Sequence, residues 1–372
     1  MNDLRFPTFE KIGVKPLINC RGFLTIISGS LLLPEVRAAM VAASNNFVHM
    51  DDLADAVGER IAELMECEWG LVVNGCAAAL TQITAAAVAG ADPEKIARLP
   101  DTTGMKNEVI VQPSHRHVYE HAVRAVGVNM VEVRNRAELD RAVGDHTALL
   151  LMMGDAADRG EISIAEMAAV GRANDVPTFV DAAAERPDVP NRYLADGVDA
   201  VGYSGGKCLR GPQSSGLILG RKDLLQTAFL NGAPHHSIGR PMKAGKEEVM
   251  GLLAAVEQWF ARDHEGEWLL WEQRLATVAS AVETIATVTT KILQPGRSNV
   301  TPILDISWDV NVFAMSPSEI ARALSEGDPR IELNATNSGV SVAPHVMEDG
   351  EAEIVGGRLV EELTRAEENH KG

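Results

Sequence analysis

The sequence predicts an α/β fold, in which a mostly parallel sheet is covered by helices and followed by a smaller α+β domain. Two observations predict this arrangement. Between residues 69 and 220, short apolar runs alternate with helical patterns, which is typical of a parallel sheet with helices on both faces. Beyond residue 245 the pattern changes to long helices and then a few strands, which indicates a second domain.

The first elements are expected in the order helix, strand, tight turn and helix. An amphipathic run at 53–68 precedes the short apolar run at 69–75, and an Ala-rich helical run follows at 77–90. Later strands are expected at further apolar runs, which are EVIVQ (108–112), ALLLMMG (148–154), PTFVDAA (177–183), VDAVGYSGG (198–206) and SGLILG (215–220). Helical patterns such as 117–127 and 163–174 lie between them.

The C-terminal part is expected to combine helices with a small sheet. Long helices at 246–288 have one polar break, ARDHEGE. The elements expected after them are the strand ILDISWDV (303–310), the helix SPSEIARALSEG (316–327), the strand pair RIELNA (330–335) and GVSVAP (339–344), and a closing helix at 351–369. We therefore expect residues 46–245 to form the large domain and 246–372 to form linking helices and the small domain. Residues 1–45 are expected to join the small domain and an interface.

Composition favours a soluble enzyme of small molecules. The net charge of −18, with no basic cluster, argues against a nucleic-acid partner, because phosphate neutralisation needs a Lys/Arg surface. No apolar stretch reaches the roughly 18 residues of a membrane span, and the start does not resemble a signal peptide, so we expect a cytoplasmic protein with no membrane partner. The cysteines lack a CxxC pair and are expected to be free thiols with no metal site.

Two strand ends carry residues suited to a phosphate or a flat ring. In an open α/β sheet, ligands bind beyond the carboxyl ends of the strands. The small-residue turn at 74–78 runs straight into a helix, whose free N–H groups would hold a phosphate, although a plain strand–helix turn would look the same. After EVIVQ come His115 and His117, each either a surface residue or a ring placed at the site.

Two further strand ends carry an acid and a lysine. Asp181 follows four strand residues and is expected to need a cationic partner, unless it is only a helix N-cap. Lys207 lies in the glycine-rich stretch SGGKCLRGPQSSG, where a desolvated amine could act as a nucleophile, or the lysine could be a solvated loop residue. A phosphate turn, a flat ring, an acid and a lysine in this order form the apparatus that binds pyridoxal 5′-phosphate. The glycines would let the cofactor lie against the backbone, and Ser204 would bind its phosphate.

Four stretches also resemble a known family: INCRGFLTIISGS (18–30), VDAAAE (180–185), YSGGKCLRGPQSSG (203–216) and SIGRPMKAGKEEVMGLLAAVEQW (237–259). They are similar to the selenocysteine synthase-like branch of fold-type I pyridoxal phosphate enzymes, within it to the D-glucosaminate-6-phosphate ammonia-lyase group. The resemblance extends over nearly the whole chain. It implies the fold-type I transferase architecture, with a mostly parallel seven-stranded type of sheet.

The resemblance also implies roles for individual residues. Lys207 matches the lysine that holds the cofactor covalently, and Asp181 matches the partner of the pyridine nitrogen. His115 matches the ring-stacking position, for which His117 is a rival. The remaining cofactor-binding positions that match are Gly75, Cys76, Ala77, Ala183 and Ser204. Fold-type I enzymes generally form dimers or higher homo-oligomers, so candidates for a substrate or cross-subunit role are Ser28, Ser30, Arg240, Lys243, Arg330 and Arg358.

The reaction implied by the resemblance is elimination. Lys207 would remove the α-proton of an amino acid, and loss of a β-hydroxyl would give a 2-oxo acid and ammonia. Racemisation or epimerisation and transamination share the first proton transfer and stay open. We set selenium transfer lower, because the bacterial enzymes carry tRNA-binding features, including an N-terminal extension, and this chain is acidic. A protein that binds the cofactor without turnover is the last possibility.

Overall fold

The structure is a computed structural model that describes residues 7–297 and 300–371. The chain divides into two compact units. Ser30–Arg262 form the larger unit, and Met1–Gly29 with Asp263–Gly372 form the smaller one. The sequence predicts domain boundaries at 45/46 and 245/246, whereas these units divide at 29/30 and 262/263.

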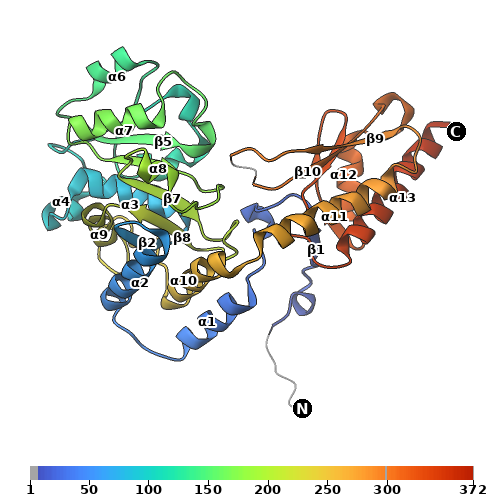
Figure 1. Ribbon diagram of the computed structural model, residues 1–372, viewed down its shortest axis with the longest axis horizontal. Helices are drawn as coiled ribbons and strands as arrows, with labels where there is room; N and C mark the ends of the chain where they lie inside the picture. Colours follow the sequence, from blue (N-terminus) through green and yellow to red (C-terminus); the bar gives the residue numbers. More distant parts are fainter. Residues whose placement is uncertain (1–6, 298–299, 372) are drawn as a thin grey trace. The chain divides into compact units, whose positions relative to one another are not determined.

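The larger unit is built on a seven-stranded sheet, which confirms the predicted α/β class (Figure 1). The strand order is β2-β8-β7-β6-β5-β3-β4. Every neighbouring pair is parallel except the two pairs made by β8, which runs antiparallel to both β2 and β7. The strands are β2 (Trp69–Val73), β3 (Glu108–Val111), β4 (Asn129–Glu132), β5 (Thr147–Met153), β6 (Thr178–Asp181), β7 (Ala200–Ser204) and β8 (Gly216–Gly220).

Helices cover this sheet because its strands are apolar on both faces. All seven residues of β5 are buried, and the Ala-rich α3 is buried on nearly every side. Small residues allow close packing: a Cβ on Gly58 of α2 would lie 2.2 Å from the Trp69 ring. The helices are α1 (Pro34–Ser44), α2 (Met50–Met65), α3 (Gly75–Ala89), α4 (Pro93–Arg98), α5 (His121–Arg124), α6 (Arg136–Ala142), α7 (Ile164–Ala173), α8 (Arg192–Ala195), α9 (Lys222–Leu230) and α10 (Lys246–Ala261).

Two parts of the larger unit differ from the sequence expectation. The helical pattern at 117–127 forms only the short 3₁₀ turn η4 (Val118–Glu120) and the single-turn α5. Helix α10 belongs to the larger unit, because it packs against α1. Gly251 makes this close contact possible, since a Cβ there would lie 2.8 Å from the Met40 side chain.

Within its described residues, the smaller unit has two small sheets and three α-helices. Strand β1 (Leu17–Asn19) pairs in parallel with β11 (Arg330–Glu332), and a second sheet has the antiparallel order β12-β13-β10-β9. Its strands are β9 (Val288–Leu293), β10 (Ile303–Trp308), β12 (Asn334–Ala335) and β13 (Gly339–Val342), and the helices are α11 (His264–Val282), α12 (Pro317–Glu326) and α13 (Glu351–Lys371). The run RIELNA, expected as one strand, is therefore divided between two sheets.

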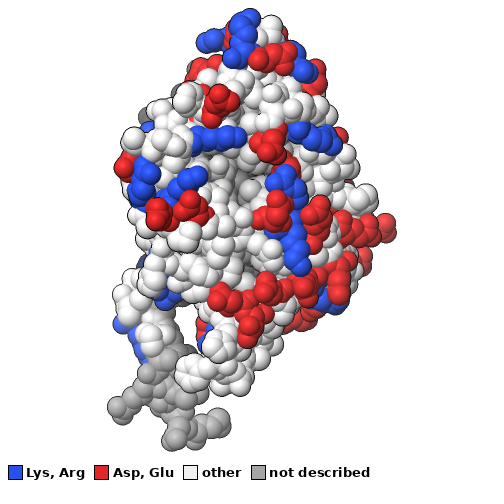
Figure 2. All heavy atoms as spheres, turned by 90° about the vertical axis from the view of Figure 1, so that its left-hand side faces the viewer, with Lys and Arg blue, Asp and Glu red and all other residues white. Residues whose placement is uncertain are grey.

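Charged side chains of both signs are interspersed on the face of the molecule drawn in Figure 2, and the larger continuous areas there are acidic. Within the described residues, no helix is long and apolar enough to cross a membrane.

Candidate active site

Three of the predicted positions lie at one edge of the large sheet. Asp181 is the last residue of β6, Lys207 lies in the turn after β7, and Gly75 follows β2. Strands β6 and β7 are parallel neighbours, with Asp181 opposite Gly202, and β2 points the same way. The carboxyl ends of these strands therefore meet at one edge, where ligands of open α/β sheets bind.

The turn at 74–77 is built to hold an anion. Gly75 has a left-handed φ of 74°, which glycine adopts without strain, and it begins α3. The first N–H groups of a helix have no acceptor within the helix, and the helix dipole favours a negative charge there. Asn74 anchors the turn, because its Nδ2 donates to the carbonyl of Lys243 at 2.9 Å. Residues 74–77 are called the phosphate turn below.

Asp181 is a buried carboxylate, with only 5% of its surface exposed. Its Oδ1 accepts hydrogen bonds from the backbone N–H of Ala183 at 3.0 Å and from the Cys76 thiol at 3.2 Å. Burial raises the pKa of Asp181, while these two hydrogen bonds and the charges of His117 and Lys207 act in the opposite direction. A cationic N–H group bound at Oδ2 would offset the cost of burying this charge.

Lys207 is half-buried, and its amine makes no hydrogen bond or ion pair with the described part of the chain. The same holds for the Ser204 hydroxyl, which ends β7. The sequence suggests that the glycines around Lys207 let a ligand approach the backbone, and the structure shows that they also make room for the chain itself. A Cβ on Gly205 would lie 2.1 Å from Ser215 Oγ, and one on Gly206 would lie 2.4 Å from Gln213 Oε1, so these glycines admit residues 211–215.

The two rival histidines differ in their surroundings. His115 is 2% exposed. Its Nδ1 accepts from the Met153 N–H at 3.0 Å and its Nε2 donates to the Arg159 carbonyl at 3.2 Å. Burial lowers the pKa of His115, so the ring is neutral and tied to backbone groups. His117 is half-buried, and its buried Nε2 makes no hydrogen bond with a described residue. Of the two histidines, His117 is therefore the one whose ring has a nitrogen open to a ligand.

The remaining candidates are divided between the two units. The Ser30 hydroxyl donates to the Gly206 carbonyl of the same chain at 3.0 Å, next to Lys207, whereas Ser28 is a left-handed residue of the smaller unit. Arg358 pairs with Glu361 and Glu362 on its own helix, α13. Arg240 is half-buried and has no ion pair with a described residue.

Several residues that brace the site were not singled out from the sequence. The Cys208 thiol donates to the Glu185 carbonyl at 3.1 Å and so ties the Lys207 turn to the segment after Asp181. Arg186 and Arg262 lie on the Trp259 ring, with their Cζ atoms 4.9 and 5.2 Å from its centroid. No sequence signal could have found these contacts, because each depends on how distant segments pack.

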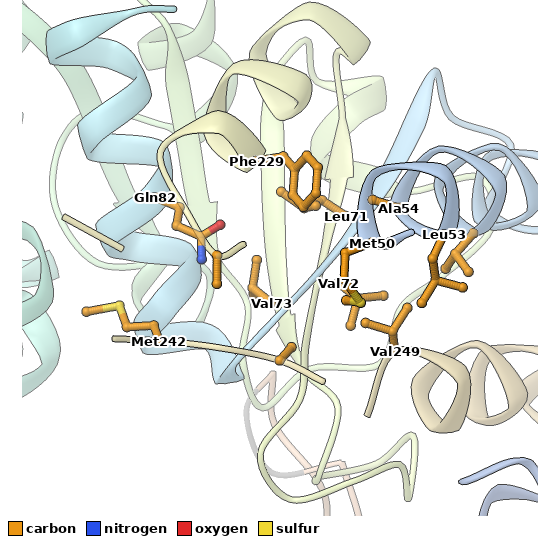
Figure 3. A pocket seen from close by; sticks show the side chains of 13 residues that line it. Met50, Leu53, Ala54, Leu71, Val72, Val73, Gln82, Phe229, Met242 and Val249 are labelled. Atoms are coloured by element: carbon orange, nitrogen blue, oxygen red, sulfur yellow. The ribbon is translucent and has the colours of Figure 1, made fainter. Parts of the chain in front are cut away.

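A mostly apolar pocket lies close to the phosphate turn in sequence, because its lining includes residues next to the turn (Figure 3). Its wall includes Val73, just before the turn, and Met242, next to the residue whose carbonyl anchors Asn74. Gln82 brings an amide to this wall, where most side chains are apolar. Asp181 and Lys207 do not line it, so it is separate from the candidate active site. Among the described residues, no group of His, Cys, Asp or Glu is arranged to hold a metal ion.

The family of the chain follows from comparison with known proteins. The family model described as SelA, L-seryl-tRNA selenium transferase, matches residues 46–312, which is well over half of the chain. The chain belongs to the SelA family. Relatives with different activities match different shares of this chain.

Two curated relatives match nearly the whole chain. D-glucosaminate-6-phosphate ammonia lyase of Salmonella typhimurium (strain 14028s / SGSC 2262) is 30% identical over 367 residues, covering 95% of this chain and 97% of the relative. 5'-C-glycyluridine monooxygenase-decarboxylase of Streptomyces sp is 32% identical over 372 residues, covering 95% and 91%. L-seryl-tRNA(Sec) selenium transferase of Moorella thermoacetica is 27% identical over 288 residues, covering 68% of this chain and 58% of the relative.

Solved structures of related proteins have the same fold as this chain. A structure of D-glucosaminate-6-phosphate ammonia-lyase is 29% identical, has a TM-score of 0.87, and covers 98% of this chain and all (100%) of that chain. Serine palmitoyltransferase of Sphingomonas wittichii has a TM-score of 0.58 at 15% identity, covering 94% and 88%. The predicted fold-type I architecture is confirmed, and the family implies pyridoxal 5′-phosphate as the cofactor.

The residues of this chain fit that cofactor. The phosphate turn presents N–H groups at the start of a helix, and Ser204 adds a hydroxyl without a hydrogen bond to a described residue. Asp181 offers one carboxylate oxygen that accepts no hydrogen bond from the described residues. At the same ends of the strands, Lys207 offers an amine that makes no hydrogen bond or ion pair within the described part of the chain. The buried Asp181 carboxylate is the clearest sign, because burial raises its pKa and one of its oxygens accepts no hydrogen bond from the described residues, which leaves that oxygen open to a positively charged donor.

Proposed function

We propose that the protein is a pyridoxal phosphate-dependent lyase, which releases ammonia from a small hydroxy amino acid or amino sugar acid. The observation that carries the cofactor role is the buried Asp181 at the end of β6, beside the β7 turn that bears Lys207. The reaction type is supported by the full-length similarity to an ammonia lyase.

Each residue then has a distinct task. The cofactor, when bound, supplies an electron sink for the substrate α-carbon. Lys207 Nζ holds the cofactor in the resting enzyme and takes the α-proton of the bound substrate. Asp181 Oδ2 keeps a proton on the pyridine nitrogen. The phosphate turn and Ser204 bind the phosphate, and His117 covers the ring face.

The chemistry balances without an external oxidant. The Cα–H proton goes to Lys207, and the Cβ–O bond breaks with loss of water once the hydroxyl is protonated. The resulting enamine tautomerises to an imine, whose hydrolysis returns the water and gives a 2-oxo acid and ammonia. Arg240 is the guanidinium we favour for the substrate carboxylate, because Arg358 is already paired with acids of α13.

A second candidate function rests on one specific observation. The relative that is a monooxygenase-decarboxylase of 5'-C-glycyluridine matches this chain over the same share, 95%, as the ammonia lyase does. An oxidative decarboxylation of an amino acid would use the same α-carbon activation but would consume O₂ and release CO₂.

Product analysis separates the two. The purified protein, loaded with the cofactor, is incubated with D- and L-hydroxy amino acids, 2-amino-2-deoxy sugar acids and their phosphates, with and without O₂. We expect equal amounts of ammonia and 2-oxo acid, independent of O₂. Release of CO₂ that requires O₂ would replace the lyase proposal with the second candidate. Racemised substrate would indicate a racemase or epimerase, and transaminated substrate would indicate an aminotransferase.

The matched control is Lys207→Ala. It is expected to lose the visible absorbance of the covalently held cofactor and to reduce turnover by orders of magnitude, because one group serves as tether and base. A wild-type protein that stays colourless with added cofactor would contradict the cofactor role itself.

We also propose a homo-oligomeric, cytoplasmic enzyme. In the isolated chain Ile26 is 86% exposed, Leu31 55% and Phe47 fully exposed at 102%, and exposed apolar side chains of this size are typical of surfaces that contact another subunit.

A further inference from the structure

The side chain of Cys76 has a partner that its place in the phosphate turn does not require. Its Sγ lies 3.2 Å from Asp181 Oδ1, although the two residues are 105 positions apart in the sequence. Both are buried, with 8% of Cys76 and 5% of Asp181 exposed. Burial and the negative charge of Asp181 raise the pKa of the Cys76 thiol well above its usual range, so the sulfur carries its proton and donates it to the carboxylate.

The two oxygens of Asp181 are consequently unequal. Oδ1 accepts from both the Ala183 N–H and the Cys76 thiol, whereas Oδ2 accepts no hydrogen bond from the described residues. Two donors that arrive at one oxygen fix the rotation of a carboxylate about its last bond. The remaining oxygen is then directed away from them and is available for another donor.

The sulfur is also held in place by packing. A Cβ on Gly202 of β7, the residue opposite Asp181 in the sheet, would lie 3.1 Å from Cys76 Sγ and 2.7 Å from the Phe179 ring. Because Gly202 has no side chain, the thiol of Cys76 can occupy the space next to it. The hydrogen bond and the packing are separate observations, and both set the position of the thiol relative to the acid.

We propose that Cys76 is a positioning residue, whose thiol orients the Asp181 carboxylate so that Oδ2 faces the ring nitrogen of the cofactor. This rests on the proposed role of Asp181. A second consequence concerns the phosphate turn: one residue serves the cofactor at two points, through its backbone N–H at the phosphate and through its side chain at the acid.

The test uses three substitutions of Cys76 in the full chain. Cys76→Ser keeps a donor, Cys76→Ala removes it, and Cys76→Val removes it while filling the space. Cys67→Ala is the matched control, because Cys67 is a half-buried thiol whose hydrogen bond goes to the Trp69 carbonyl, outside the site. The readouts are the dissociation constant of pyridoxal phosphate and the pH midpoint at which the ¹⁵N-labelled ring nitrogen loses its proton.

We expect Cys76→Ala and Cys76→Val to weaken cofactor binding roughly threefold to tenfold, the effect of one lost hydrogen bond. Their ring-nitrogen midpoint should fall by about 0.5 to 1 pH unit, because a carboxylate that is free to rotate no longer directs Oδ2 at the ring N–H and so stabilises the pyridinium proton less. Cys76→Ser should stay within about twofold of wild type, and Cys67→Ala should not change either readout.

Several results would overturn the proposal. One is an unchanged affinity and midpoint in folded Cys76→Ala and Cys76→Val, which would make the thiol a packing group only. Another is a Cys76→Ser variant that behaves like Cys76→Ala. Failure of the wild type to bind the cofactor would overturn both this proposal and the proposed function, whereas cofactor binding without ammonia release would remove the reaction alone and leave the thiol measurements decisive.

Discussion

Replacing Gly216 with alanine is expected to weaken cofactor binding by disturbing the phosphate turn. Gly216 begins β8 and faces the residues that begin α3. A Cβ at this position would lie 2.6 Å from the Gly75 carbonyl carbon, 2.8 Å from its oxygen and 2.9 Å from the Cys76 nitrogen. All three are backbone atoms, so no side-chain rotation relieves the contact and the turn itself has to move.

The magnitude follows from the distances. Ordinary contacts to a Cβ begin at 3.4 Å, so the turn has to move by about 0.8 Å relative to β8. Overpacking of this kind costs about 1–3 kcal/mol in well-packed regions. If the turn shifts to relieve that strain, cofactor binding has to return the turn to its original position, and the strain energy is then lost from the binding free energy. At 1.4 kcal/mol for each factor of ten, the cofactor affinity falls roughly 5-fold to 150-fold.

The assay is a titration of the cofactor-free protein with pyridoxal phosphate, followed by visible absorbance, with urea unfolding of the same variant. Gly144→Ala is the matched control, because a Cβ on Gly144, also in the larger unit, meets no atom within 4 Å. The reasoning is refuted if Gly216→Ala lowers stability but keeps its cofactor affinity within twofold of wild type. The displaced turn would then not hold the phosphate.

Three further predictions concern the histidines, the N-terminal segment and acid. His117→Ala should reduce the cofactor affinity about tenfold. His115→Ala should mainly lower the free energy of unfolding, because the His115 ring is hydrogen-bonded to backbone groups. Cofactor titration and urea unfolding measure the two effects, and the reverse result would make His115 the residue that contacts the ring. Deleting residues 1–33 should weaken both subunit assembly and cofactor binding. If light scattering showed that the fully active wild type is a monomer, a site shared between subunits would be contradicted. Burial lowers the pKa of His345 to about 4 from 6.5, so between these values the unfolded chain binds more protons and acid destabilises the fold. On going from pH 7 to pH 4, the free energy of unfolding measured with urea should fall by up to about 3 kcal/mol more for the wild type than for His345→Phe. If the free energies of unfolding of the two proteins changed in parallel with pH, the prediction would be wrong.

Most of the parallel part of the large sheet could be predicted from the sequence, although β4, which pairs in parallel with β3, was not among the predicted strands. Strands β5, β6 and β7 are apolar runs that end in chemically distinct residues, and such runs are buried on both faces wherever helices cross over between them. The direction of β8 was not predicted, but the short connection before it explains the antiparallel pairing. Only the glycine-rich stretch separates β7 from β8, with no helix to return the chain, so the two strands have to run antiparallel.

Other elements could not be read from local patterns. Strand β1 has three residues and exists because β11 lies beside it, more than three hundred positions later. Strand β9 begins at Val288, where the sequence predicts the end of a long helical run and no strand. In both cases long-range pairing decides the conformation, and the local pattern is only a weak preference.

The candidate site divides in the same way. Asp181, Lys207 and the phosphate turn could be predicted, because the type of residue that follows each predicted strand is read directly from the sequence. The thiol–carboxylate contact of Cys76 and the backbone partners of His115 were not visible, because they depend on atoms brought together from separate segments.

The glycines around Lys207 show why composition alone misleads. A glycine-rich stretch suggests a mobile loop that opens to a ligand. Here Gly205 and Gly206 lie against residues 211–215, the Gly205 N–H donates to the Ser215 carbonyl at 2.9 Å, and the Gly211 N–H donates to the Gly205 carbonyl at 2.8 Å. The chain needs glycine there because atoms of Ser215 and Gln213 occupy the positions that a Cβ would take. The turn is therefore held firmly, and the freedom that a proton-transferring amine needs is confined to the side chain of Lys207.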